Sequence, residues 1–163
     1  MRSPDNRFPM TLVFLRDGDK ILLAMKKRRF GEGKWNGVGG KLEPGETIEQ
    51  AAIRETQEEI NVTIDEMHPV GVLYFTQEPY LNNNSNVDVH VFVADKWTGE
   101  PVETEEMKPQ WFNVDDVPFD NMWPDDPFWL PYVIEGKTVE GDFLFNEAFD
   151  LVDHDVRVTS EVA

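Results

Sequence analysis

The chain contains no cysteine among its 163 residues. This absence excludes disulfide bonds, a thiolate nucleophile and any zinc site built on cysteine. Histidine is also scarce, since His68, His90 and His154 are the only three in the sequence. A metal ion bound by this chain is therefore expected to be held by oxygen atoms, which favours magnesium, manganese or calcium.

The sequence also lacks long apolar runs and an excess of positive charge. No segment approaches the roughly 20 apolar residues of a transmembrane helix, and the first ten residues, MRSPDNRFPM, lack the apolar stretch of a signal peptide. We therefore expect a cytoplasmic protein without a membrane partner. The net charge of -17 argues against a nucleic acid polymer as partner, because such binding uses a basic surface to neutralise phosphates.

Positive charge is nevertheless concentrated in one segment, between positions 20 and 41. Seven of the fifteen basic residues lie there against a single acidic residue, Glu32, which gives a local balance of +6. The seven are Lys20, Lys26, Lys27, Arg28, Arg29, Lys34 and Lys41. This pattern fits either a solvated charged loop or a binding site for a small anionic ligand.

Apolar alternation and turn residues predict one domain over residues 1–163 in which helices cover a sheet, an α/β (α+β) fold. Strands are predicted over 10–17, 20–27, 68–77, 86–96, 108–114, 139–149 and 150–158. One helix is predicted from 48 to 61, opened by a capping box of Thr47 and Gln50. A second is predicted over 126–136, interrupted or bent by Pro131, and the last few residues are expected to fray.

The first predicted helix carries three glutamates, Glu55, Glu58 and Glu59. At about 100° per residue, they lie within about 80° of Ile48, as do Ala51, Ala52 and Val62, whereas Gln50, Arg54 and Gln57 lie on the far side. The glutamates thus continue the apolar face. Partly buried like charges are costly, so protons or divalent cations are expected among them. Three carboxylates at this spacing converge well on a hard cation.

The same segment closely resembles the Nudix box. The matching pattern is Gly40, five residues, Glu46, seven residues, and then RETQEEINV from Arg54 to Val62. Two positions depart from it: Thr56 stands where an aliphatic residue is usual, and Asn61 stands where the box has glycine. That glycine is expected to end the helix in the left-handed conformation, and asparagine is the best replacement there.

Similarity extends over nearly the whole chain to the MutT-related, mammalian-type oxidised purine nucleoside triphosphatases. The matching segments are KKRRFGEGKWNGVGGK, DVHVF, EEMKPQWF and DNMWPDDPFW. This resemblance implies a Nudix-type α/β/α sandwich with a mixed central sheet. It also implies a magnesium-dependent pyrophosphohydrolase, with manganese as a possible substitute, that converts nucleotides of the 8-oxo-dGTP type to monophosphate and pyrophosphate. The chain departs from the family at Arg29, Val38 and Val87, which replace glycine, phenylalanine and methionine, and in an expanded loop over 81–86.

The resemblance further implies the catalytic residues. Glu55, Glu58 and Glu59 are expected to bind magnesium, helped by the Gly39 carbonyl and by Glu106, and Glu59 is expected to help activate water as well. Lys26 and Lys41 are candidates for contacts to phosphate oxygens. Arg54 is expected to brace Glu46 or neighbouring loop carbonyls instead of touching substrate.

A base pocket is predicted from separated pieces of the chain. Asn36 offers a donor and an acceptor, and the neighbouring carboxyls of Asp125 and Asp126 can share a proton and so suit more than one purine. Thr11 completes this polar set. Aromatic walls are expected from Phe30, Phe75, Trp123 and Trp129, although a core position fits Phe75 equally well. The segment WPDD also reads as a surface turn with an N-cap aspartate, and both roles can hold together.

Three functions therefore remain open. The leading one is hydrolysis of oxidised purine triphosphates, and the second is a Nudix hydrolase for another nucleotide, such as ordinary or methylated purine triphosphates. The third is a non-catalytic nucleotide-binding or metal-binding module, which the intact glutamates disfavour. The sequence gives no indication of the oligomeric state.

Overall fold

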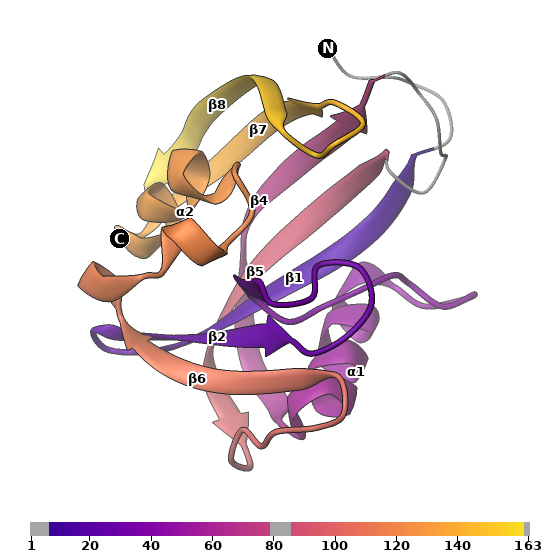
Figure 1. The fold of residues 1–163 in the computed structure, drawn as a ribbon. Coiled ribbons are helices and arrows are strands. Elements are labelled where there is room, and N and C mark those ends of the chain that lie inside the picture. Colours follow the sequence, from indigo (N-terminus) through magenta and orange to yellow (C-terminus); the bar gives the residue numbers. More distant parts are fainter. Residues whose placement is uncertain (1–6, 79–85, 162–163) are drawn as a thin grey trace.

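The computed structural model describes residues 7–78 and 86–161, which form a mixed sheet with two α-helices (Figure 1). The strand order is β3-β2-β1-β5-β4-β7-β8, and β6 pairs with β2. The strands are β1 (Phe8–Asp17), β2 (Lys20–Lys26), β3 (Trp35–Asn36), β4 (Thr63–Gln77), β5 (Val87–Thr98), β6 (Met107–Asn113), β7 (Lys137–Phe145) and β8 (Leu151–Glu161). The helices are α1 (Ile48–Ile60) and α2 (Asp126–Ile134), with short 3-10 turns at Val114–Asp116 and Phe119–Asn121.

The sheet forks between β1 and β2, and this fork positions the site. The two strands pair only next to their turn, where Arg16 lies opposite Ile21 and Asp17 opposite Lys20. Farther along, β2 pairs with β3 and β6, and β1 pairs in parallel with β5 (Figure 1). The glycine-rich loop, residues 28–41, lies along the free side of β1 through bridges from Val38 to Val13 and from Lys41 to Met10. The loop that precedes α1 is thereby fixed against the sheet.

The two helices cover opposite faces of the sheet. Side chains alternate along β1, so Phe14 packs in one core with α2, whereas Val13 and Leu15 pack in the other core with α1. Trp129 and Leu130 are the fully buried members that α2 contributes. The arrangement confirms the predicted α/β/α fold with a mixed central sheet.

Element types were predicted better than element boundaries. β4 begins at Thr63 and not at residue 68, because polar residues and Pro69 hid its first half. The sheet tolerates Pro69 at a register shift before Gly71, where a missing ladder hydrogen bond costs little. The two-residue strand β3 was not predicted, and α2 ends at Ile134 without interruption at Pro131. Residues 81–85 of the expanded loop and the last two residues lie outside the described ranges.

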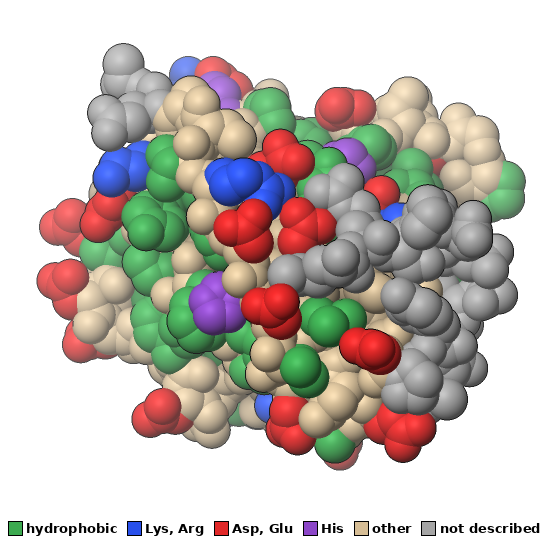
Figure 2. All heavy atoms as spheres, turned by 90° about the horizontal axis from the view of Figure 1, so that it is seen from above, with side chains coloured by type: hydrophobic (Ala, Val, Ile, Leu, Met, Phe, Trp, Pro, Cys, Tyr) green, Lys and Arg blue, Asp and Glu red, His purple; other side chains and the backbone are tan. Residues whose placement is uncertain are grey.

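The molecular surface carries the acidic excess. Figure 2 shows a face on which acidic side chains are spread among apolar and polar ones. Within residues 7–78 and 86–161, no helix has the length and apolar character needed to cross a membrane.

Candidate active site

The ends of α1 are fixed by local chemistry, which orients its glutamates. The Thr47 hydroxyl accepts a hydrogen bond from the Gln50 N–H at 3.1 Å, and the Gln50 side chain accepts one from the Thr47 N–H at 2.9 Å. At the other end Asn61 adopts φ 61° and ψ 39°, and its N–H donates to the Gln57 carbonyl. The predicted capping box and left-handed terminus are both confirmed.

Glu55 and Glu59 face the glycine-rich loop. The Glu59 carboxyl accepts a hydrogen bond from the Gly39 N–H at 3.2 Å. Burial, reinforced by the nearby Glu55 carboxylate, raises the pKa of Glu59 to about 8, and burial also raises the pKa of Glu55. A Cβ atom on Gly40 would lie 2.8 Å from the Glu55 carboxyl, so a larger residue there would displace this carboxyl. These two carboxyls therefore occupy the partly buried positions predicted for them.

Glu58 was expected on the same buried face, and that expectation was wrong. Its side chain is 57% exposed. The buried face of α1 is shifted toward Thr56 and Ile60, both fully buried, and at about 100° per residue this leaves Glu58 at the edge of the face. The unusual Thr56 is accommodated because its hydroxyl donates to the Ala52 carbonyl at 2.8 Å.

Arg54 supplies a positive charge among the glutamates. Its guanidinium donates to both Glu46 carboxylate oxygens, at 2.7 and 3.0 Å, to Glu55 at 2.9 Å and to Glu58 at 3.1 Å. It also donates to the Lys41 carbonyl at 3.1 Å, which confirms its predicted bracing role. Two expectations were wrong: Arg54 does not lie apart from the glutamates, and protons or divalent cations are not the only charges that offset them.

Glu106, a predicted metal ligand, lies on the segment before β6. Thr104 of that segment donates from its hydroxyl to the Glu59 carbonyl at 2.8 Å, which ties the segment to the end of α1. The Glu106 carboxylate accepts a hydrogen bond from Arg28 Nε at 3.1 Å, and this contact lowers the pKa of Glu106. The metal-binding role of Glu106 therefore stays a prediction.

A cavity of about 690 Å³ opens beside the glycine-rich loop. All nine residues predicted to bind substrate line it: Thr11, Lys26, Phe30, Asn36, Phe75, Trp123, Asp125, Asp126 and Trp129. Gly39, Lys41 and the divergent Val87 line it too. A second cavity, of about 420 Å³, lies among residues of α1, β4, β5, β7 and β8 and contains none of the predicted residues. The larger cavity is therefore the candidate substrate site.

Asp125 and Asp126 form a buried carboxyl pair in this cavity, only 3% and 2% exposed. Burial raises the pKa of Asp125 to about 6, and burial together with the neighbouring Asp125 charge raises the pKa of Asp126 well above its ordinary value. The Trp129 indole donates to Asp125 at 2.8 Å, and Asp126 Oδ2 is buried without a hydrogen-bond partner. Burial and mutual proximity therefore favour the retention of a proton on this pair.

Asp125 does take the N-cap position of α2, but the prediction that these aspartates lie on a surface turn was wrong, because both are buried. Asp125 precedes α2 with α-helical dihedral angles, and its side chain makes no capping hydrogen bond. The carboxylate bonds to the Trp129 indole instead, because both groups are buried and the indole needs an acceptor.

Asn36 keeps only part of its predicted hydrogen-bonding capacity. Its side-chain oxygen accepts from the Gly37 N–H at 2.8 Å, which leaves the amide N–H groups and one oxygen lone pair for a ligand. Val38, which departs from the family pattern, is buried in the core with α1 and does not line the cavity. Arg29, another departure, has a φ of 70°, which explains why glycine is favoured at that position.

Sequence reasoning missed part of the cavity lining. The missed residues include Met10, Leu12, Lys34, Val89, Met107, Phe145 and Phe149. Most are apolar strand residues that resemble core positions in sequence, and Phe149 lies in the turn between β7 and β8. No spacing in the sequence indicates that this turn reaches the cavity.

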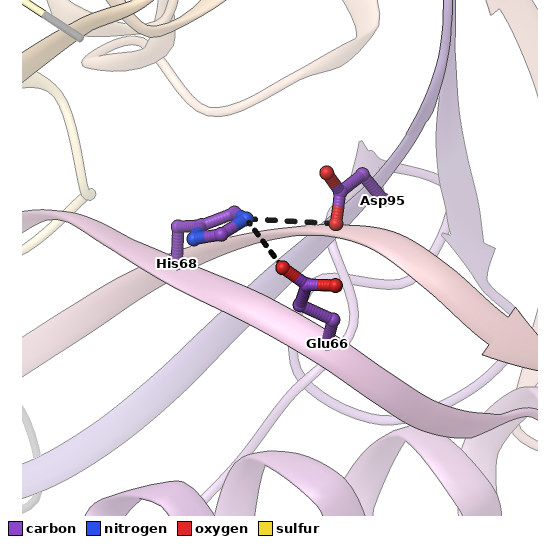
Figure 3. Close-up of side chains that lie close together, drawn as sticks. All are labelled: Glu66, His68 and Asp95. Carbon is purple, nitrogen blue, oxygen red and sulfur yellow. Dashed lines mark ion pairs between the residues drawn. The ribbon is translucent and has the colours of Figure 1, made fainter.

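A separate cluster of possible metal ligands lies on β4 and β5 (Figure 3). His68 Nε2 lies 3.5 Å from Asp95 Oδ1 and 3.8 Å from Glu66 Oε1, and Lys96 Nζ lies 3.1 Å from Glu66 Oε2. Among the described residues no other group of three such ligands is this compact, the α1 glutamates included, because Glu58 turns to Arg54. The cluster is exposed and none of its members lines either cavity.

Comparison with known proteins gives matches that cover most of the chain. The NUDIX domain family matches residues 6–133. The zebrafish (Danio rerio) oxidized purine nucleoside triphosphate hydrolase is 46% identical over 89% of this chain and 91% of its own length. The mouse (Mus musculus) protein of the same name is 43% identical over 90% of this chain and 92% of its own. A MutT protein of Bacillus halodurans has a similar structure, with a TM-score of 0.78, 27% identity, and coverage of 91% of this chain and 97% of its own.

Proposed function

The chain belongs to the Nudix family, and we propose that it is a magnesium-dependent nucleoside triphosphate pyrophosphohydrolase. Its substrates are oxidised purine nucleotides of the 8-oxo-dGTP type, and its products are the nucleoside monophosphate and pyrophosphate. One observation carries the proposal: a single cavity joins Gly39, which holds Glu59, to the carboxyl pair of Asp125 and Asp126. The similarity to two vertebrate hydrolases named for oxidised purines supports this substrate class.

The residues of the box fit a hard divalent cation. The proposed ligands are Glu55, Glu58, Glu59 and the Gly39 carbonyl, all oxygen donors of the kind that magnesium and manganese prefer. Burial raises the pKa of Glu59 to about 8, so its ionised form is costly without a nearby positive charge. When bound, the metal supplies charge neutralisation for the phosphates and a more acidic water molecule.

The remaining roles are phosphate binding, proton acceptance and base binding, and we assign them to side chains in or beside the cavity. Lys26 and Lys41 line the cavity and carry the positive charge that phosphate oxygens require. Glu59 is the group that accepts a proton from the attacking water, since its carboxyl lies beside Gly39 at the edge of the cavity. Asn36, Asp125 and Asp126 bind the base, because 8-oxidation turns the purine N7 acceptor into a donor and adds an oxo acceptor.

A second substrate class has an observation in its favour. Because Asp125 and Asp126 share a proton, the pair can accept from one base and donate to another. Val87, which lines the cavity, also changes the wall relative to the family pattern. Ordinary or methylated purine triphosphates are therefore the alternative substrates.

We further propose that residues 1–163 act as a single domain in the cytoplasm. The partner is a small nucleotide and not a nucleic acid polymer, because the net charge of -17 disfavours a long polyanion.

Pyrophosphate release tests the proposal directly. Wild type, Glu59→Gln and Glu49→Gln are assayed with 8-oxo-dGTP, dGTP and a methylated purine triphosphate, with and without magnesium. Glu49 is the matched control because it is an exposed glutamate on the same helix, at one of the seven unspecified positions of the box. We expect release that needs magnesium and Glu59 but not Glu49. Binding of nucleotides without release would indicate a non-catalytic module, and fastest release from an unoxidised nucleotide would favour the alternative substrates.

A further inference from the structure

Phe149 is an aromatic residue of the cavity in an unfavourable backbone conformation. It lies in the turn between β7 and β8 with a φ of 61°, in the left-handed region that a bulky side chain rarely adopts. Such a conformation costs free energy and persists only where the surroundings enforce it. We therefore expect the Phe149 ring to have a role that offsets this cost.

The turn that carries Phe149 is held by a dense set of hydrogen bonds. The Asn146 side-chain oxygen accepts from the Ala148 N–H at 2.9 Å and from the Asp150 N–H at 3.0 Å, and the Phe149 N–H donates to the Asn146 carbonyl at 3.0 Å. The Gln77 side chain, from the end of β4, donates to the Asn146 carbonyl at 3.2 Å. The turn is thus anchored to the sheet, and its geometry fixes where the Phe149 ring points.

The Phe149 ring meets three other aromatic residues of the cavity. Its centroid lies 5.0 Å from Phe30 at an angle of 61°, 6.0 Å from Trp123 at 68°, and 6.5 Å from Phe145 at 50°. These partners come from the glycine-rich loop, the segment before α2 and the end of β7. All four residues line the cavity that contains the Asp125 and Asp126 pair. Phe30 and Trp123 also contact each other, with centroids 5.1 Å apart, so Phe149 connects Phe145 to this pair and completes one aromatic wall.

We propose that Phe149 is a specificity-determining residue that makes the cavity prefer bicyclic over monocyclic bases. This inference rests on the proposed function, because it assigns the aromatic wall to the base of the nucleotide. Contact with aromatic rings stabilises a bound base in proportion to the flat surface that the base offers. A purine offers more of that surface than a pyrimidine, so removing one ring of the wall weakens purine binding more.

The alternative explanation is that Phe149 only stabilises the fold. Two substitutions that differ in their tolerance of the left-handed backbone conformation can distinguish this role from base selection. Phe149→Ala and Phe149→Gly both remove the ring, but glycine also relieves the unfavourable φ. The glycine variant should therefore unfold at a higher denaturant concentration than the alanine variant. If the ring selects the base, both variants share one binding defect despite this difference in stability.

The experiment measures binding of 8-oxo-dGMP and dCMP by calorimetry in the presence of magnesium. Proteins compared are wild type, Phe149→Ala, Phe149→Gly, Phe149→Tyr and the control Phe128→Ala. Phe128 is an exposed aromatic residue that packs on His154 and does not line the cavity. We expect the Kd for 8-oxo-dGMP to rise roughly threefold to tenfold in the alanine and glycine variants, with a smaller rise for dCMP. The tyrosine and control variants should bind as wild type does.

Two results would overturn the inference. One is an unchanged ratio of the two Kd values in both ring-less variants, and the other is a failure of wild type to prefer 8-oxo-dGMP over dCMP. Failure of the proposed function is seen separately, as wild-type protein that binds 8-oxo-dGMP but releases no pyrophosphate from the triphosphate.

Discussion

The substitution Glu59→Gln tests two effects of this carboxyl separately, namely how much its burial lowers the free energy of unfolding and how much it contributes to turnover. Burial raises the pKa of Glu59 to about 8 in the metal-free protein, against an ordinary value of 4.5. Between these values the folded protein holds a proton that the unfolded chain has lost, so the free energy of unfolding falls as pH rises from 4.5 to about 8. At about 1.4 kcal/mol for each pH unit, that interval corresponds to at most about 5 kcal/mol.

Glu59→Gln should remove this pH dependence because glutamine does not titrate. The new amide can still accept from the Gly39 N–H and can donate to the Glu55 carboxylate, as the protonated glutamate does. The variant should therefore be more stable than wild type above pH 7 in EDTA. Its turnover should nevertheless fall by at least about a hundredfold, judged by the loss of single electrostatic groups in other enzymes.

Urea unfolding from pH 5 to pH 9 in EDTA measures the effect, with Glu49→Gln as the control. The gap between Glu59→Gln and wild type should widen as pH rises, and magnesium at pH 8 should stabilise wild type more than the variant. Parallel pH profiles for the two proteins would refute the reasoning that burial of Glu59 is costly.

Substitutions at three further positions test other parts of the site. Asn61→Gly should change the free energy of unfolding little, whereas Asn61→Val should lower it by about 1–2 kcal/mol because a β-branched residue disfavours the left-handed conformation; equal unfolding midpoints would contradict this. Gly40→Ala should fold normally, because the new Cβ meets only the end of the Glu55 side chain, but turnover should fall by roughly a hundredfold as that carboxylate is displaced; a normal rate would show that the position of Glu55 is unimportant. In wild type, KM for 8-oxo-dGTP should rise with pH as the buried pair loses its shared proton, and Asp126→Asn should flatten that rise; matching pH profiles would count against a shared proton.

Structural features that depend on a few neighbouring residues, such as helix ends, could be predicted from the sequence. Thr47 and Gln50 satisfy each other's backbone N–H groups, and Asn61 has a side chain that tolerates the left-handed region, so both ends of α1 follow from the sequence. The residues of the cavity followed from resemblance to a family, because they come from distant segments that no spacing rule connects.

Some side-chain contacts depend on the folded surroundings and could not be predicted from the sequence. The helical projection placed Arg54 on the far side of the helix from the glutamates, yet its long side chain reaches Glu55 and Glu58 and offsets their charge. Asp125 stands at the start of α2, where an aspartate often caps the helix with its side chain. Its carboxylate instead accepts a hydrogen bond from the buried Trp129 indole and makes no capping hydrogen bond. Phe149 gave no signal at all, because its role depends on a turn conformation that glycine or asparagine would normally mark.

The ratio of kcat/KM for 8-oxo-dGTP to that for dGTP tests the central claim most directly. In the presence of magnesium the wild-type ratio should be roughly tenfold to a hundredfold, because dGTP leaves a buried hydrogen-bonding group of the base site unpaired. Asp125→Ala and Asn36→Ala should lower the ratio, whereas Glu59→Gln should slow both substrates alike. A ratio near one in wild type would contradict the assignment of this cavity to oxidised purines.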